Sequence, residues 1–253
     1  MGRIIAIANQ KGGVGKTTTA INLAAALAEA GEKILAIDFD PQGNMTSGFG
    51  IEKNSTEKTV YDLILGESEI EEVLQATEFK NLYILPTNVN LSGAEIELMD
   101  MEEREFALKN GIQKIIDDYN YIIIDCPPSL SILTVNALTA ADTVIVPIQC
   151  EYYALEGLGQ MIRTIELVRE RLNDKLEIEG IVFTMFDPRN NLSQQVVENV
   201  KENLNERIYN TVIPRNVRLA EAPSFGMPIT EYDSKSSGAE SYRMLAAEVI
   251  GRR

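Results

Sequence analysis

The chain has 253 residues, no histidine and a formal net charge of −15 at pH 7. Its length fits one large domain or two small ones, and the lack of histidine excludes histidine-based triads, histidine general acid–base catalysis and most transition-metal sites. No apolar run approaches the roughly 18 residues of a membrane helix, and no charged-then-apolar leader opens the sequence. We therefore expect a cytoplasmic protein.

Charge is unevenly distributed along the chain. Residues 52–118 contain 16 acidic and 6 basic residues, whereas residues 186–253 contain 9 of each. The overall negative charge argues against nucleic-acid binding, but the balanced C-terminal part leaves room for a basic face. The two cysteines, Cys126 and Cys150, each end an apolar run. We expect both to be buried, small hydrophobic residues without a disulfide.

Strand-like and helix-like segments alternate from the start of the chain. An isoleucine-rich run at 3–9 ends in a glycine loop, an alanine- and leucine-rich segment at 16–30 stops at Gly31, and a second apolar run covers 33–40. This order predicts a βαβ unit. Further strands are predicted at 81–86, 121–128, 142–150, 178–186 and 209–214, and further helices at 103–119, 152–172, 191–206 and 238–250. The alternation predicts one α/β domain over residues 1–253, with a doubly wound, mostly parallel sheet and helices on both faces.

The glycine loop after the first predicted strand is a variant of a phosphate-binding loop. The usual form is G-x-x-x-x-G-K-[ST], and Gly15 begins its second half. Gln10 stands where the first glycine is expected, and a second lysine, Lys11, follows it. Glycines let backbone N–H groups approach phosphate oxygens at a helix N-terminus. We expect Lys16 on the β- and γ-phosphates and the Thr17 hydroxyl on Mg²⁺.

Carboxylates mark two further strand ends. Asp38 and Asp40 face the same side of an extended segment, where they can hold metal-bound waters or orient an attacking water. Asp125 follows an apolar run and is typical of a carboxylate that supports Mg²⁺. Pro127 and Pro128 would stiffen a loop able to sense the γ-phosphate. A simpler interpretation of Asp38 and Asp40 is a turn with helix-capping aspartates, and a simpler interpretation of Asp125 is an aspartate that caps a helix.

Ligands bind where the carboxyl ends of such strands meet. The three strand ends together therefore predict Mg²⁺-dependent nucleotide hydrolysis. Positioning and electrostatics suffice for phosphoryl transfer, so the reaction does not need a histidine.

These motifs occur in the order of a known family. The stretches are "KGGVGKTTT", "DFDPQGN", "IIIDCPPSL", "QCEYYALEGL" and "VIPRNVRLAEAPSFG". In them the chain resembles ParA/Soj-type chromosome or plasmid partition ATPases, which are deviant Walker-A P-loop NTPases of the MinD/ParA superfamily. The resemblance implies a slow ATPase that forms an ATP-bound sandwich homodimer. That dimer would bind double-stranded DNA without sequence preference, and a ParB/Spo0J-type centromere-binding partner would stimulate hydrolysis and release it.

The resemblance also implies roles for residues of the site. Lys11 would contact the phosphates of ATP bound to the other subunit, and Glu151 would hold Lys11 while the subunits are apart. Lys11, Lys16 and Asp40 would be catalytic, with Asp40 orienting the hydrolytic water. Thr17 would bind Mg²⁺ directly. The residues that would support Mg²⁺ through water are Asp38 and Asp125.

The implied ATP-binding set extends beyond the loop. Pro214 and Asn216 match positions that contact adenine, and Met185 lies either beside the ring or in the core. The full set is Lys11, Gly12, Gly13, Val14, Gly15, Lys16, Thr17, Thr18, Pro214 and Asn216.

The resemblance also implies DNA contact through two arginines, and with it a nucleoid location. Arg189 and Arg218 match family positions that touch DNA, and Arg215, Arg252 and Arg253 could extend that surface. Solvated surface arginines are the simpler alternative. The chain departs from the family in the stretch "SFGMP", where histidine and lysine are frequent in relatives, and this puts a DNA contact from that loop in doubt.

Three other functions remain open. A MinD-like membrane-cycling ATPase of the same fold would need a basic amphipathic C-terminal helix. The last predicted helix carries Glu240 and Glu248, so we expect it to pack on the domain and expect no membrane partner. A redox or cluster carrier would need two cysteines at a dimer interface. A binding scaffold without turnover would not need both Asp40 and Lys16.

Overall fold

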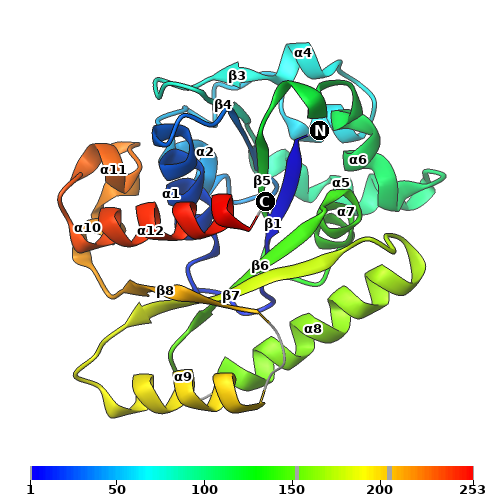
Figure 1. Ribbon diagram of the computed structural model, residues 1–253. Helices are drawn as coiled ribbons and strands as arrows, with labels where there is room; N and C mark the ends of the chain where they lie inside the picture. Colours follow the sequence, from blue (N-terminus) through cyan, green and yellow to red (C-terminus); the bar gives the residue numbers. More distant parts are fainter. Residues whose placement is uncertain (1, 152–153, 204–206, 253) are drawn as a thin grey trace.

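The computed structural model describes residues 2–151, 154–203 and 207–252, and in this part of the chain eight strands form one sheet (Figure 1). Their order across the sheet is β3-β4-β2-β5-β1-β6-β7-β8. The strands are β1 (Arg3–Ile7), β2 (Ile34–Asp38), β3 (Gln75–Ala76), β4 (Leu82–Leu85), β5 (Tyr121–Asp125), β6 (Thr143–Gln149), β7 (Glu177–Phe186) and β8 (Ile208–Pro214).

The sheet is doubly wound, as predicted. Neighbouring strands run parallel throughout, except that the short edge strand β3 pairs antiparallel with β4. The chain starts in the middle of the sheet, with β1 between β5 and β6, and winds outward in both directions. The reversal of strand order at β1 is the position where sheets of this kind bind ligands.

Helices connect the strands. The α-helices are α1 (Lys16–Glu29), α2 (Asn44–Gly48), α3 (Val60–Ile64), α4 (Ile70–Val73), α5 (Ala94–Glu97), α6 (Ala107–Ile112), α7 (Ile132–Ala140), α8 (Ala154–Arg171), α9 (Asn191–Asn203), α10 (Val217–Glu221), α11 (Ile229–Tyr232) and α12 (Ser237–Gly251). Short 3-10 helices are η1 (Val89–Ser92), η2 (Leu98–Asp100), η3 (Arg104–Phe106), η4 (Gln113–Asp118) and η5 (Ala222–Phe225). The first two residues of the helix predicted over 152–172 and the last three of the helix predicted over 191–206 lie outside the described residues.

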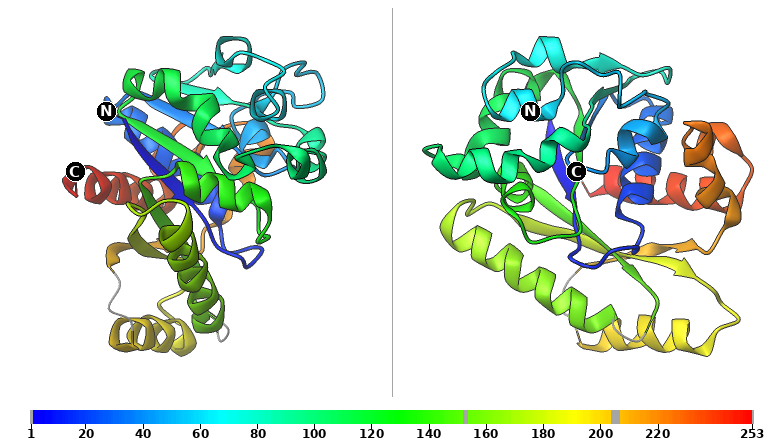
Figure 2. Two further views of the ribbon diagram at one scale, coloured as in Figure 1. Left: turned by 90° about the vertical axis from the view of Figure 1, so that its right-hand side faces the viewer. Right: turned by 180° about the vertical axis from the view of Figure 1, so that it is seen from behind.

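Both faces of the sheet are buried. On β1, Ile4 and Ala6 pack into one hydrophobic core, whereas Ile5 and Ile7 pack into a second core on the opposite face. Helices α7, α8 and α9 contribute to the first core, and α1 and α12 contribute to the second (Figures 1 and 2). Burial on both faces explains why the strands read as continuous apolar runs rather than as alternating ones.

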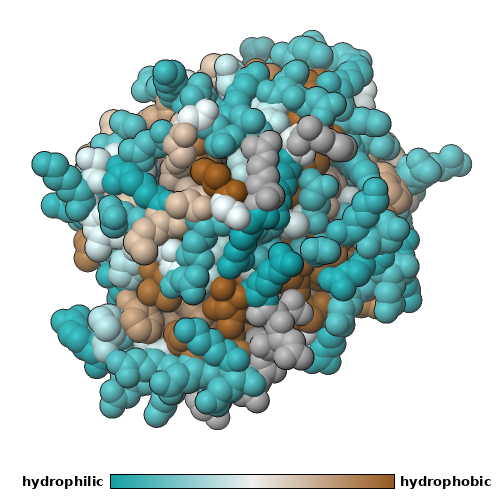
Figure 3. All heavy atoms as spheres, viewed as in Figure 1, coloured by the Kyte–Doolittle hydropathy of each residue, from teal (hydrophilic) through white to brown (hydrophobic). Residues whose placement is uncertain are grey.

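The closing helix α12 packs on the sheet. Tyr242, Leu245, Ala246 and Val249, which share one face of α12, are at most 1% exposed. On the face seen in Figure 3, hydrophobic residues appear only as separate patches in a mostly hydrophilic surface. Among the described residues, no helix combines the length and the apolar character needed to cross a membrane.

The helix predicted over 103–119 is wrong as a single element. The structure divides this segment into η3, α6 and η4, and Glu103 has a left-handed φ of 54° that a helix does not accommodate. The predicted stripe is nevertheless buried, from Leu108 to Tyr119. Gly111 lies inside the stripe, where a Cβ would approach Leu63 Cγ to 3.0 Å. Glycine weakens a helix interior, and close packing against α3 fixes this segment instead.

Candidate nucleotide-binding site

The carboxyl ends of β1, β2 and β5 meet at one edge of the sheet. In the strand register, Ile7 of β1 and Asp38 of β2 both lie beside Asp125 of β5. The phosphate loop leaves β1 at this edge and leads into α1. The structure therefore brings together the three sequence features that predicted a nucleotide site.

Side chains from outside the loop hold the phosphate loop in place. The Asn9 side chain donates from Nδ2 to the Pro147 carbonyl (2.8 Å) and accepts from the Lys11 N–H (3.0 Å). At the other end of the loop, the Thr184 hydroxyl donates to the Val14 carbonyl (2.8 Å). Strands β6 and β7 thus help to fix a loop that belongs to β1, and such a site is pre-organised for a ligand.

The turn into α1 leaves backbone N–H groups for an anion. Gly13 and Gly15 have left-handed φ values of 76° and 88°, which glycine adopts without strain. Gly15 is the N-cap of α1, and no side chain caps this helix. The first N–H groups of a helix have no partner within the helix, and the helix dipole adds positive charge there. The geometry suits phosphate oxygens.

The two lysines of the loop point to different partners. Lys16, which is 6% exposed, donates from Nζ to the Lys11 carbonyl (3.0 Å) and so folds back across the loop. Burial lowers the pKa of Lys16, and the Asp125 carboxylate opposes this shift. The Lys11 side chain instead forms an ion pair with Glu151. The pair that the family resemblance implied is therefore present in the single subunit.

Asp38 is a buried carboxylate held by α2. Its Oδ2 accepts both the N–H and the hydroxyl of Thr46 (2.7 Å each), and its Oδ1 accepts the Asp40 N–H (3.4 Å). Burial raises the pKa of Asp38 to about 6, although the Thr46 hydrogen bonds oppose the shift. Asp40 itself accepts the Gln42 N–H at 3.0 Å and is 7% exposed.

Asp125 is buried between Asp38 and Lys16 without a hydrogen-bond partner. Both of its carboxylate oxygens are inaccessible and unpaired among the described residues. Burial raises the pKa of Asp125 well above its usual range, and the Asp38 carboxylate raises it further. The Thr17 hydroxyl is close enough to lower this pKa, but it lies outside hydrogen-bonding geometry. Two unpaired buried oxygens are costly unless a ligand satisfies them.

A hollow of about 340 Å³ opens over the loop. Asp40 lines it together with Gln42, Asn44, Pro128 and Met185, and the predicted phosphate-binding residues in its wall are Gly12, Gly13, Gly15, Lys16, Thr17 and Thr18. Lys11 and Val14 do not line it, because Lys11 is engaged by Glu151 and Val14 is buried. Asp38 and Asp125 lie beneath the wall of the hollow rather than in it.

A second hollow of about 310 Å³ adjoins the first and shares Gly15, Thr18 and Met185 with it. Pro214 and Asn216 line this second hollow, and much of its lining is apolar. A flat apolar base fits beside a phosphate tail in two such connected spaces. Asn216 also caps α10 through its Oδ1 and donates to the Ser237 hydroxyl (2.9 Å).

Met185 is not a core residue. The residue is 37% exposed, and it lines both hollows. Its φ of 51° is in the left-handed region, which is uncommon for a residue with a side chain. Such strain is concentrated at binding sites, so the position favours the alternative in which Met185 lies beside the base.

The two arginines implied in DNA binding are exposed and paired with acids. Arg189, with 88% of its side chain exposed, contacts both carboxylate oxygens of Asp187 at 3.1 Å. Arg218 contacts Glu221 (3.0 Å) and Asp233 (3.5 Å). Neither arginine lines the nucleotide hollows.

Arg252 does not extend the exposed surface that Arg189 and Arg218 were expected to offer to DNA. Its guanidinium stacks on the Tyr209 ring at 3.9 Å and donates to the carbonyls of Glu179 and Ile208. Arg253 lies outside the described residues.

Several residues of the site were not predicted as such. Gln42 and Asn44 belong to the quoted stretch "DFDPQGN", so their place in that motif was the available signal. Thr46 and Thr184 act through hydrogen bonds to Asp38 and to the loop. Nothing in the sequence pattern marks a threonine at those positions, because the contacts depend on how α2 and β7 pack in the fold.

A phosphate loop at the carboxyl edge of a doubly wound parallel sheet defines a P-loop nucleotide-binding protein. A family model described as an AAA domain matches residues 2–178. The chain is 55% identical over 249 residues to the sporulation initiation inhibitor protein Soj of Bacillus subtilis, covering 98% of both chains. It is 53% identical over 252 residues to the chromosome partitioning protein ParA of Myxococcus xanthus, covering 100% of this chain and 89% of the relative.

A solved structure with a similar fold comes from Mycobacterium smegmatis. It is described as cobyrinic acid a,c-diamide synthase with bound ADP and magnesium, and it is 39% identical to the chain with a TM-score of 0.88, covering 99% of this chain and 94% of the other. Because the identity to Soj and ParA exceeds half over nearly the full length, this chain belongs to the ParA/Soj family of deviant Walker-A ATPases.

Proposed function

We propose that this chain is a partition ATPase that hydrolyses ATP to ADP and phosphate and that cycles on and off DNA as a homodimer. One observation carries the proposal. A phosphate loop with two lysines lies beside Asp38, Asp40 and Asp125, and one of the lysines, Lys11, pairs with Glu151 and does not line the hollow of its own subunit. The single-domain organisation over residues 1–253 and a cytoplasmic, nucleoid-associated location are part of the same proposal.

The residues present fit Mg²⁺ and ATP. The buried, unpaired oxygens of Asp125 would accept from metal-bound water, and Thr17, which lines the hollow, would contact the metal through its hydroxyl. No group of three or more acidic or sulfur-containing side chains is arranged to hold a metal among the described residues. This agrees with a site in which a hydroxyl, phosphates and waters supply most ligands. When bound, Mg²⁺ neutralises charge on the β- and γ-phosphates.

The chain's own residues supply positioning and charge. Lys16 would leave its carbonyl partner for the β- and γ-phosphates, and the N–H groups from Gly12 to Thr18 would cradle phosphate oxygens. Asp40, which lines the hollow, would orient the attacking water. Pro214, Asn216 and Met185 would enclose the base. These residues position the water and stabilise charge, and the family resemblance supports slow intrinsic hydrolysis that a partner stimulates.

Lys11 provides the proposed dependence of the dimer on ATP. Two subunits with a charge of −15 each repel one another, and a triphosphate adds negative charge at their interface. Transfer of Lys11 from Glu151 to the phosphates of the partner subunit would offset that charge only while the nucleotide is present. ATP would therefore hold the homodimer together, and a ParB/Spo0J-type partner would stimulate its hydrolysis.

DNA binding would follow from dimerisation. Arg189 and Arg218 are already paired with acids, so one subunit offers few net positive contacts. Each phosphate neutralised adds about 0.9 to the slope of log affinity against log salt. Two subunits double the number of contacts on one surface, and that makes binding measurable.

Sedimentation of the Asp40→Ala protein tests the proposal. With ATP and Mg²⁺ this protein should sediment as a dimer and should carry DNA with it, because hydrolysis no longer separates the subunits. The further change of Arg189→Glu with Arg218→Glu should keep the dimer but lose DNA. Lys58→Glu with Lys80→Glu, at two exposed lysines elsewhere, is the control of equal charge. Equal dimerisation with ADP, or DNA retained by the arginine double variant, would contradict the proposal.

The MinD-like alternative predicts binding to vesicles instead of DNA. Co-sedimentation with anionic liposomes and with DNA, each in the presence of ATP, separates the two functions. We expect the protein to sediment with DNA and not with liposomes, because the apolar face of α12 is already buried in the core.

A further inference from the structure

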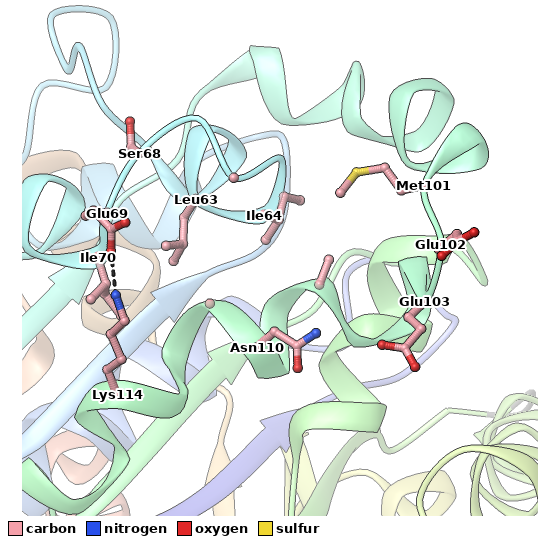
Figure 4. Close-up of a pocket in the computed structure, with 13 residues that line it drawn as sticks. Leu63, Ile64, Ser68, Glu69, Ile70, Met101, Glu102, Glu103, Asn110 and Lys114 are labelled. Carbon is pink, nitrogen blue, oxygen red and sulfur yellow. Dashed lines mark hydrogen bonds and ion pairs between the residues drawn. The ribbon is translucent and has the colours of Figure 1, made fainter.

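A separate pocket of about 300 Å³ lies between α3 and α6 (Figure 4). Its lining shares no residue with the two hollows of the nucleotide site. Figure 4 shows apolar side chains turned into this space from several elements, with Ile64 on one side and Met101 on another. Met101 is 37% exposed and so presents apolar surface to an incoming group. We call this space the α3–α6 pocket.

Acidic side chains dominate the charge at the rim of the α3–α6 pocket. At one end Lys114 donates to Glu69 at 2.6 Å, so the cation in the lining is neutralised by its own neighbour (Figure 4). At the other end Glu102 and Glu103 are exposed, and no described residue forms an ion pair with either. The pocket also lies in the segment 52–118, which holds 16 acidic and 6 basic residues.

The size of the α3–α6 pocket restricts what it can hold. Its volume is at the lower end of the roughly 300–1,000 Å³ range of ligand pockets, which suits one large aliphatic or aromatic side chain. The mouth is open near Gly66, where an added Cβ would meet no atom within 4 Å. The lining is as polar as it is apolar, with Asn110 and Ser68 among the polar residues. Apolar side chains beside an acidic rim are complementary to a chain segment carrying an apolar anchor beside cations.

We propose that the α3–α6 pocket docks a short basic segment of a partner protein. One apolar side chain of that segment enters between Ile64, Met101 and Ala107, and its flanking lysines or arginines face Glu102 and Glu103. Bound nucleotide is not required, because the pocket and the nucleotide site have no residue in common. A failure of the proposed ATPase cycle would therefore leave this surface intact.

A synthetic peptide tests the docking directly. The probe is a fluorescein-labelled peptide of about 12 lysines and alanines with one central leucine, and the readout is fluorescence anisotropy with the full chain at low salt. Replacing the leucine by serine should weaken binding about tenfold, because the anchor loses its buried apolar surface. Glu102→Gln with Glu103→Gln should weaken binding about fivefold through the loss of two partly screened ion pairs.

A matched variant separates docking from general attraction to an acidic protein. Glu57→Gln with Glu78→Gln removes the same charge at exposed positions of the same acidic segment, outside the pocket, and should change affinity by less than about twofold. Equal losses in the two double variants, or no binding at about millimolar peptide, would overturn the proposal. Photo-crosslinks from the central position should map to Met101 or Ile64, and crosslinks elsewhere would also overturn it. Self-association that only the Glu102 and Glu103 changes abolish would assign the pocket to a second copy of the chain instead.

Discussion

Replacing Asp38 by asparagine should stabilise the fold while it impairs the site. Asp38 is 0% exposed, and burial raises its pKa from 3.8 to about 6. One pKa unit corresponds to about 1.4 kcal/mol, so ionised Asp38 costs the folded state about 3 kcal/mol at neutral pH. An asparagine carries no charge, and its side-chain oxygen can still accept the two hydrogen bonds from Thr46.

The sign of the pH dependence follows from the raised pKa. Between the unfolded value of 3.8 and the folded value of about 6, the folded chain binds more protons, so the free energy of unfolding falls as pH rises. The asparagine variant lacks this loss. The free energy of unfolding of the variant should therefore exceed that of the unchanged chain by a margin that grows by about 1.5 kcal/mol between about pH 5 and about pH 8. The lower limit avoids the isoelectric point near 4.5.

Urea unfolding followed by circular dichroism measures this difference. Asp100→Asn, at an exposed position, is the control and should shift the free energy of unfolding by less than about 0.5 kcal/mol. The Asp38→Asn protein should also lose about tenfold or more of its Mg²⁺-dependent ATP hydrolysis, because a carboxylate that orients metal-bound water is gone. A variant that is less stable than the parent by the same amount at both pH values would refute the reasoning.

Three further changes test other parts of the structure. Gly180→Ala should destabilise the fold by about 1–3 kcal/mol in urea unfolding, because its Cβ would lie 2.7 Å from the Tyr209 ring. A Cβ on Gly12 meets no atom within 4 Å, so Gly12→Val should retain the parent's melting temperature and ATP binding by calorimetry, yet sediment as a monomer with ATP. Glu151→Gln removes the carboxylate charge that pairs with Lys11 and should lower the ATP concentration needed for dimerisation in analytical ultracentrifugation, and an unchanged requirement would contradict the role given to this pair.

The sheet was largely predictable from the sequence because its strands are continuous apolar runs. β1 and β5 are buried on both faces, and such burial leaves a direct trace in composition. The short helices were not predictable from periodicity. α2 and α3 each contain five residues, too few to be stable without tertiary packing. The capping box that joins Thr59 and Asp62 was the available local signal for α3.

The candidate site was predictable where it is local in sequence and not where it depends on contacts between distant residues. The loop and each strand-end aspartate belong to a short motif of their own, so residue types and spacing within each motif indicate phosphate and metal chemistry. The support that Thr46 gives to Asp38 also involves the N–H of Thr87, which donates to the Thr46 hydroxyl at 3.0 Å. Likewise, Arg218 meets Asp233 only because α10 and α11 pack together.

The exposure of the Lys11–Glu151 pair decides whether Lys11 can exchange Glu151 for the phosphates of a nucleotide bound to a second subunit. Its side chains are 32% and 36% exposed, and ion pairs of this kind contribute about 0–1 kcal/mol because water screens them. A triphosphate enclosed between two subunits carries more charge in a medium of lower effective dielectric constant, so the same lysine interacts more strongly there. A fully buried pair would hold Lys11 too tightly to exchange. The ATP requirement of the proposed dimer can therefore arise from the difference between a weak partner and a strong one, without a rearrangement of the sheet.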